Sequence, residues 1–217
     1  MKTIVCYGDS ITWGCLPFAS VAAPPIRLAK AQRWAHVMAR EIMAREIGQE
    51  LEIIEDGLSG RTTVFDDPIE GAHKNGSRHL PVCIEANSPL DLLIIMLGGN
   101  DFKIHFNATA FTSARGMLTL IHQVKGFYAL SDGCPEILIV TPPKISTRAE
   151  PAFWGDAWQR CQGHADYLSQ VAERTGCHHF DANSVTEPGM DGTHIDARGH
   201  EALGKALATQ VGQILAL

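Results

Sequence analysis

The sequence predicts an α/β protein built on a parallel β-sheet. Short runs of β-branched and other apolar residues alternate with longer segments of helical period, which is typical of βα units on such a sheet. The chain has 217 residues, of which 45% are hydrophobic and 19% are charged. A chain of this length and composition can bury a core of its own, so we expect residues 1–217 to form one domain.

Five runs are predicted to be strands. The third run is apolar at every position, which indicates that both of its faces are covered and places it in the middle of the sheet. The fifth run is the shortest and the least apolar. The runs are Thr3–Tyr7, Leu51–Glu55, Leu92–Leu97, Ile137–Thr141 and His178–Phe180.

Four segments between or after these strands have helical spacing. The last one repeats apolar residues at intervals of three and four, and Asp196 stands where its N-cap is expected. The segments are about Gln32–Ile47, Phe111–Ala129, Asp156–Thr175 and Ala197–Ala216.

Two long proline-rich connections, Cys15–Lys30 and Pro142–Gly155, carry no recognisable motif. Connections of this length in a compact domain are usually functional, so we expect them to border a site.

Composition and sequence pattern argue against a nucleic-acid partner, a cysteine-based metal or redox site, and a membrane span. The net charge of −6 argues against a nucleic-acid partner, because such binding needs clustered Lys and Arg. The six cysteines form no C-x-x-C pair, so neither a zinc knuckle nor a thioredoxin-like site is indicated. The N-terminus lacks the pattern of a signal peptide, and no apolar run approaches the roughly 18 residues of a membrane span. We therefore expect a cytoplasmic protein that binds a small molecule and contacts no membrane.

Polar residues gather directly after the predicted strands. In an open parallel sheet, ligands bind beyond the carboxyl ends of the strands, so these residues are expected to share one edge of the sheet. Each group alone consists of ordinary turn residues, and the signal is their joint placement. The groups are Gly8-Asp9-Ser10, the segment 56–63 with Ser59-Gly60, Gly98-Gly99-Asn100-Asp101, and Asp191-Gly192-Thr193-His194.

These residue types suit acyl transfer. Such chemistry needs a hydroxyl nucleophile, an imidazole base, a carboxylate that orients the imidazole, and amide donors for the oxyanion. Ser10, His194 and Asp191 can fill the first three roles. The backbone N–H groups of Ser10 and Gly60 and the side-chain amide of Asn100 can supply the donors.

The same groups resemble the four sequence blocks of the GDSL, or SGNH, hydrolase family. The blocks occur in the family's order along nearly the whole chain, and residues 8–14 and 55–63 resemble the bacterial arylesterase and acyltransferase branch. The resemblance implies a flavodoxin-like three-layer αβα sandwich with strand order 2-1-3-4-5. It also implies Ser10 as nucleophile, Asp191 and His194 as its partners, and an oxyanion hole of Ser10, Gly60 and Asn100, without metal or cofactor.

Several functions stay open. The leading hypothesis is a serine esterase that cleaves short-acyl or aryl carboxylic esters through an acyl-enzyme and also transfers the acyl group to alcohols. A carbohydrate acetyl esterase or a thioesterase of the same family is the nearest alternative. A metal-dependent phosphoesterase is disfavoured by Thr12 and Asp101, which stand where Asp and His are expected. A non-catalytic flavodoxin-like binding domain is permitted by the fold alone.

Two tryptophans are candidate substrate-binding residues. Trp13 follows the first polar group, and Trp154 lies in an aromatic cluster with Phe153 and Trp158. The simpler interpretation of that cluster is core packing. The functional interpretation is that it forms the wall of a pocket for an acyl or aryl group. Ser59 lacks the G-x-S-x-G context of a nucleophile and is expected to brace its loop. Relatives in this branch are often oligomers, and the 15–30 connection is a candidate contact between copies.

Overall fold

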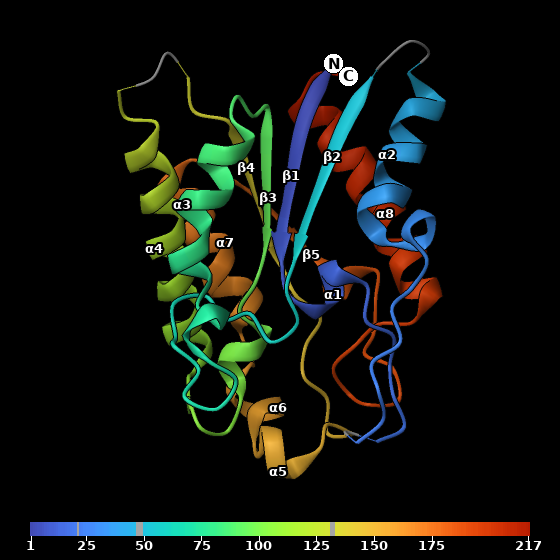
Figure 1. Cartoon of the computed structure of the whole chain (residues 1–217), viewed down its shortest axis with the longest axis vertical. Coiled ribbons are helices and arrows are strands. Elements are labelled where there is room, and N and C mark those ends of the chain that lie inside the picture. The colour runs from blue at the N-terminus through green and yellow to red at the C-terminus, as the bar shows by residue number, and fades with distance from the viewer. Residues whose placement is uncertain (21, 47–49, 131–132) are drawn as a thin grey trace.

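A five-stranded parallel sheet forms the centre of the protein. The computed structural model describes residues 1–20, 22–46, 50–130 and 133–217. The strand order is β2-β1-β3-β4-β5, and every neighbouring pair is parallel, which confirms the expected order (Figure 1). The strands are β1 (Lys2–Gly8), β2 (Leu51–Gly57), β3 (Leu92–Met96), β4 (Glu136–Thr141) and β5 (His178–Asp181).

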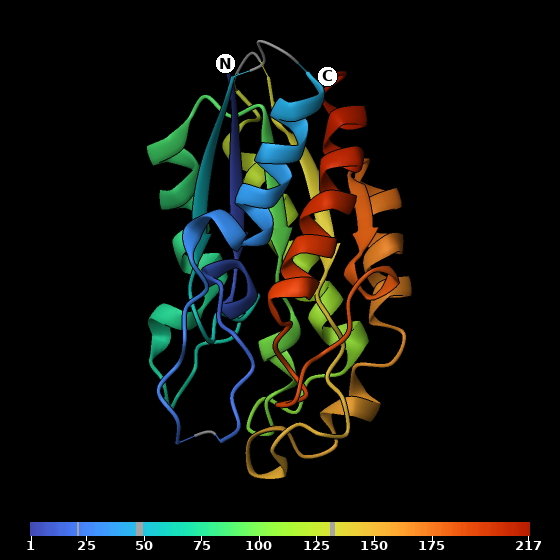
Figure 2. The ribbon, with the colours of Figure 1, turned by 90° about the vertical axis from the view of Figure 1, so that its right-hand side faces the viewer.

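Helices cover both faces of this sheet, which makes three layers. The helices α3 (Gly76–Asn87), α4 (Ala110–Phe127) and α7 (His164–Thr175) lie on one face. The helices α2 (Trp34–Arg45) and α8 (Ala197–Ile214) lie side by side on the other (Figures 1 and 2). Alternate residues of β3 enter the two cores: Leu93 and Ile95 pack on the first side, and Leu92 and Ile94 on the second. The continuous apolar run of this strand follows from its central place in the sheet.

Three of the predicted helices form close to their predicted limits. They are α2 (Trp34–Arg45), α4 (Ala110–Phe127) and α8 (Ala197–Ile214). The predicted end of the first, Ile47, lies outside the described residues. Asp196 is the N-cap of α8, and its side chain accepts a hydrogen bond from the Gly199 N–H at 2.8 Å.

The prediction of one continuous helix over 156–175 is wrong. The segment holds a short helix α6 (Ala157–Arg160) and a separate helix α7 (His164–Thr175), and a further short helix, α5 (Pro151–Trp154), precedes them. The break spans residues 161–163, and Gly163, the N-cap of α7, has a φ of 74° in the left-handed region. Glycine adopts this conformation at little cost, and a helix cannot continue through it.

Helix α3 (Gly76–Asn87) was not predicted, because Pro81 lies inside it and interrupts the usual signal. Proline lacks the N–H that would bond to the carbonyl four residues earlier. That carbonyl belongs to Ser77, and it accepts a hydrogen bond from the Gln123 side chain of α4 at 3.2 Å instead. A contact between distant segments therefore compensates for the local defect.

The carboxyl ends of the strands lead into the loops that matter for function. The short helix α1 (Ser10–Trp13) follows β1 at once, and the Asp9 side chain caps it by accepting from the Ile11 N–H. A 3-10 helix, Gly99–Phe102, follows β3.

Residue 21 of the 15–30 connection lies outside the described residues. Within the described ranges, none of the helices combines the length and hydrophobicity that a bilayer crossing requires.

Candidate active site

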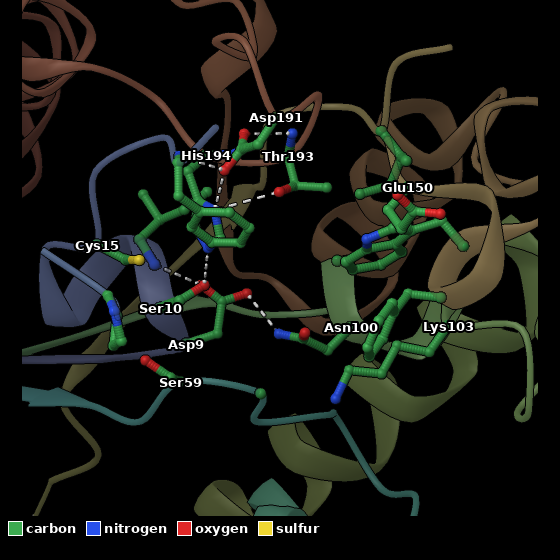
Figure 3. A pocket seen from close by; sticks show the side chains of 18 of the residues that line it. Asp9, Ser10, Cys15, Ser59, Asn100, Lys103, Glu150, Asp191, Thr193 and His194 are labelled. Carbon is green, nitrogen blue, oxygen red and sulfur yellow. Dashed lines mark hydrogen bonds and ion pairs between the residues drawn. The ribbon is translucent and has the colours of Figure 1, made fainter. Parts of the chain in front are cut away.

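A cavity of about 360 Å³ opens at the carboxyl edge of the sheet (Figure 3). Residues from all four predicted polar groups line it, among them Ser10, Gly60, Asn100 and His194. Both proline-rich connections contribute to its walls as well, through residues such as Phe18, Pro25 and Phe153. The structure thus brings together segments that lie far apart in the sequence.

Ser10, His194 and Asp191 form a continuous chain of hydrogen bonds in this cavity (Figure 3). The Ser10 Oγ lies 2.9 Å from the His194 Nε2, and the His194 Nδ1 lies 2.7 Å from the Asp191 Oδ2. This arrangement leaves Nε2 able to accept the serine proton while the carboxylate holds the opposite ring nitrogen. The three side chains therefore have the geometry of an activated nucleophile.

The loop that carries Asp191 and His194 folds around its own carboxylate. The Asp191 Oδ1 accepts hydrogen bonds from the backbone N–H groups of Thr193 at 3.0 Å and His194 at 2.9 Å. Gly192 between them has a φ of 74°, and a Cβ there would lie 2.3 Å from the Ala149 nitrogen. Only glycine fits this turn, so the spacing of the Asp-x-x-His block follows from its backbone.

The pKa values of Asp191 and His194 are shifted in opposite directions. Burial alone would raise the pKa of Asp191, but its hydrogen bonds from His194 outweigh burial and lower it. Burial, the largest single influence, would lower the pKa of His194, but the hydrogen bonds and charges of Asp191 and Cys15 together outweigh burial and raise it to about 9. The Asp191 carboxylate therefore favours the imidazolium that forms when the histidine takes a proton.

The expected oxyanion donors lie on the other side of Ser10. The Gly60 N–H has no hydrogen-bond acceptor among the described residues, and its φ of 80° lies in the left-handed region. The Asn100 Nδ2 donates to the Asp9 Oδ2 at 3.3 Å and to the Arg61 carbonyl at 3.1 Å. A substrate oxyanion would compete with these two acceptors for the amide hydrogens of Asn100.

Asp9 is the buried acceptor that orients this amide. Burial raises the pKa of Asp9 to about 6, and its hydrogen bond from the Ile11 N–H limits the rise. At neutral pH the group is mostly ionised, because the solution pH lies above this pKa. An ionised Asp9 accepts from Asn100, so the donor is held in place before any substrate arrives.

Arg61 and Asp101 tie the strand ends together beneath the cavity. The Arg61 guanidinium donates to the Gly8 carbonyl at 2.9 Å and to the Asp56 Oδ1 at 2.7 Å, and it lies 4.2 Å from the Tyr7 ring centre. Asp101 accepts from the Thr63 backbone and hydroxyl and from the Ser113 hydroxyl. The sequence offered no signal for these roles beyond the polar character of two residues that prove to be fully buried.

The two predicted substrate-binding tryptophans have different positions. Trp13 is not among the described residues that line the cavity; the Arg27 guanidinium lies 4.7 Å from its ring centre. Trp154 does line the cavity, and it also packs on a small core that includes Phe102 and Ile145. Trp154 therefore takes part in core packing, and its contact with an acyl or aryl group stays a prediction.

Ser59 lines the cavity too, but the hydrogen bond that braces its loop uses its carbonyl. That carbonyl accepts from the Lys74 Nζ at 2.7 Å.

Across the described ranges, no group of three or more His, Cys, Asp or Glu side chains is arranged to hold a metal ion.

Solved structures of similar proteins share this fold over their full length. A carbohydrate acetylesterase from Sinorhizobium meliloti, Est24, is 32% identical with a TM-score of 0.90, and the match covers 99% of this chain and 100% of that one. The aryl esterase of M. smegmatis is 37% identical with a TM-score of 0.89, with the same coverage. A second carbohydrate acetylesterase family member from S. meliloti is 34% identical with a TM-score of 0.89, and both chains are covered completely.

A search of the curated proteins found no match. A sequence model of the GDSL-like lipase/acylhydrolase family matches residues 6–202, which include every residue of the hydrogen-bonded chain. The strand order and the structural neighbours agree with this match. The chain therefore belongs to the GDSL-like lipase/acylhydrolase family and is an ester-hydrolysing enzyme.

Proposed function

We propose that the protein is a serine esterase that cleaves small carboxylic esters with short acyl or aryl groups through an acyl-enzyme on Ser10. The observation that carries this proposal is the chain of hydrogen bonds from Ser10 through His194 to Asp191 in an open cavity. Asp191 and His194 act as orienting group and base, and Ser10, Gly60 and Asn100 supply the oxyanion donors.

The reaction has two halves. In the first, the Ser10 Oγ attacks the ester carbonyl carbon while its proton passes to the His194 Nε2. The carbonyl oxygen becomes an oxyanion that accepts from the N–H groups of Ser10 and Gly60 and the amide of Asn100. When the tetrahedral intermediate collapses, the bond to the leaving oxygen breaks and His194 returns the proton to that oxygen.

The second half repeats these steps with water as the nucleophile. Water attacks the acyl carbon, its proton passes to His194, and the carboxylic acid leaves as the proton returns to the Ser10 Oγ. An alcohol that enters in place of water receives the acyl group instead. The same residues thus support both hydrolysis and transfer.

The cavity suits small esters. Its volume of about 360 Å³ lies near the lower end of the range for small-molecule sites. Phe153, Trp154, Pro142 and Met190 give one wall an apolar surface, which favours a short acyl chain or an aromatic ring. The aryl esterase of M. smegmatis, 37% identical, supports this choice.

Acetylated carbohydrate is the second candidate substrate. Glu70 and Lys103 also line the cavity and carry charged groups that can bond to hydroxyls. Est24, a carbohydrate acetylesterase, is 32% identical over 99% of this chain. Comparing kcat/KM for phenyl acetate and for an acetylated sugar decides between the two candidates.

Labelling with a fluorophosphonate tests the proposed mechanism. We expect a covalent adduct on Ser10, located by mass spectrometry, and no adduct in Ser10→Ala. The same variant should lose ester turnover by at least about 10³-fold, since the nucleophile is absent. Turnover close to that of the unmodified protein in folded Ser10→Ala would refute the proposal, as would labelling at a different residue.

A further inference from the structure

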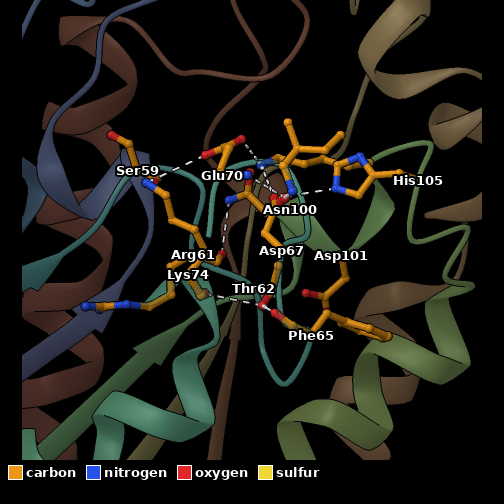
Figure 4. Close-up of polar contacts among 12 residues, drawn as sticks. Ser59, Arg61, Thr62, Phe65, Asp67, Glu70, Lys74, Asn100, Asp101 and His105 are labelled. Carbon is orange, nitrogen blue, oxygen red and sulfur yellow. Dashed lines mark hydrogen bonds and ion pairs between the residues drawn. The ribbon is translucent and has the colours of Figure 1, made fainter. Parts of the chain in front are cut away.

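A network of charges, buried at Asp67 and Lys103 and exposed at Glu70, lies next to the Ser59-Gly60 loop (Figure 4). Its centre is Lys103, whose side chain is only 6% exposed although it carries a charge. The Lys103 Nζ donates to the Asp67 Oδ2 at 3.2 Å and to the Glu70 Oε1 in a closer contact. Nearly buried lysines are uncommon unless they are paired, so the two carboxylates account for its position.

Asp67 is the fixed end of this network. It accepts from the backbone N–H groups of Ile69 at 2.8 Å and Glu70 at 2.9 Å, and the His105 Nε2 lies 3.4 Å from it. Burial alone would raise the pKa of Asp67, but these backbone donors and Lys103 outweigh burial and lower it to about 2. Asp67 therefore stays ionised and anchors Lys103.

Glu70 carries the network to Gly60. A Cβ built on Gly60 would lie 2.4 Å from the Glu70 Oε2 and 3.5 Å from the Lys103 Nζ. The end of the Glu70 side chain thus occupies the space that a Cβ on Gly60 would take. Glu70 and Lys103 also line the cavity, so the contact lies at the site itself.

Lys74 holds the neighbouring peptide from the other end. Its Nζ donates to the Ser59 carbonyl at 2.7 Å and lies 3.6 Å from the Glu70 Oε2. The Ser59-Gly60 segment is therefore held by Lys74 at one carbonyl and by Glu70 at the following Cα. A glycine at φ 80° has many other conformations available, and these contacts favour the one that Gly60 adopts.

We propose that Glu70 and Lys103 are positioning residues that hold the Gly60 N–H where the oxyanion forms. This inference rests on the proposed role of Gly60 as an oxyanion donor. Glu70 and Lys103 contact Gly60 and not the ester bond. They therefore act on the transition state through the position of the Gly60 N–H. Displacing a donor by a fraction of an ångström weakens it in the transition state while leaving ground-state binding nearly unchanged.

The test uses Glu70→Gln and Lys103→Met in the full-length protein, with phenyl acetate as substrate. Both variants should lower kcat by roughly tenfold, with KM within about twofold of the unmodified value, because a misplaced donor costs less than the roughly 10²-fold or more of a deleted one. The pH at which kcat/KM is half-maximal should not move, because His194 is untouched. The double variant should be no slower than the slower single variant, since both changes break one unit.

Glu201→Gln is the matched control. Glu201 also pairs with two cations, Arg40 and Lys205, but it lies on α8 away from the cavity. We expect its kcat to be unchanged. If Glu70→Gln and Lys103→Met fold, show lower melting temperatures and keep full kcat, the network is structural only and the inference fails.

Two further outcomes also overturn the inference. A shift in the pH profile of the variants would show that the charges act on His194 and not on Gly60. If the unmodified protein neither labels at Ser10 nor turns over esters, the proposed function fails, and the role of the network falls with it. Lys103→Arg, which keeps the cation, should recover part of the lost kcat.

Discussion

The cavity has a floor and a rim that are built in opposite ways. The floor, defined as Asp9, Arg61, Asn100 and Asp101, lies at the ends of β1, β2 and β3, and each of these residues is at most 8% exposed. The rim, defined as Phe153 and Met190, lies on loops, and these side chains are 48% and 65% exposed. Hydrogen bonds connect Asn100 to Asp9 and Arg61, and Arg61 to the ends of β1 and β2, whereas the rim presents apolar surface to solvent.

This difference separates two tasks. Stabilising an oxyanion requires donors that are already in place, and we propose that the buried floor provides one of them, the amide of Asn100. Choosing a substrate requires contact area that can vary, and exposed loops tolerate such variation. Changes to the floor should therefore alter kcat, and changes to the rim should alter KM and the preference among esters.

The sharpest test of the floor is Asn100→Ala. We expect kcat to fall by about 10²- to 10³-fold, because one oxyanion donor is lost while Ser10, His194 and Asp191 stay in place. KM should change little. Steady-state kinetics with phenyl acetate measures both, and circular dichroism checks that the variant is folded.

Asn87→Ala provides the control for Asn100→Ala. It also removes a side-chain amide, one that donates to the Cys83 carbonyl near the end of α3, away from the cavity. Its kcat should equal that of the unmodified protein. A kcat for Asn100→Ala close to normal would show that Asn100 is only a turn residue. It would also show that the floor does not stabilise the transition state.

The candidate active site and its surroundings could be predicted from the sequence only in part. Ser10, Asn100 and His194 follow apolar strands or precede a capped helix, so their place at one edge of the sheet follows from local patterns. Arg61 and Lys103 gave no such signal, because a charged residue in a loop is normally solvated. Their burial depends on partners, such as Asp56 and Asp67, that only the folded chain brings close.

The fold shows the same division. The strands and three helices follow from periodicity, whereas α3 depends on a tertiary contact between Gln123 and the Ser77 carbonyl. The break between α6 and α7 depends on the conformation of one glycine, Gly163. Local pattern predicts elements that are stable by their own sequence, and it misses those that a distant partner completes.

The pH dependence tests the coupling between Asp191 and His194. His194 must be neutral to accept the Ser10 proton, and its pKa is raised to about 9, so activity should fall as the pH drops through that value. We expect kcat/KM to decrease by about tenfold per pH unit below the midpoint, and the midpoint to lie clearly above the ordinary histidine value of 6.5. Rates measured between pH 5 and pH 10, on protein shown to be folded at each pH, give the midpoint. A midpoint at or below 6.5 would contradict the raised pKa of His194 and the contribution of Asp191 to it.

The smallest effect belongs to the rim, and Phe153→Ala measures it. Phe153 lines the cavity and is 48% exposed, so truncation should cost little stability and should raise KM for aryl esters by roughly fivefold, equivalent to about 1 kcal/mol of lost apolar contact. The kcat should stay within about twofold, because the floor is intact. Phe111→Ala is the control, since Phe111 is 52% exposed on α4 and contacts Tyr167 away from the cavity. If Phe153→Ala lowers kcat as strongly as KM rises, the rim takes part in the transition state and the division between floor and rim does not hold.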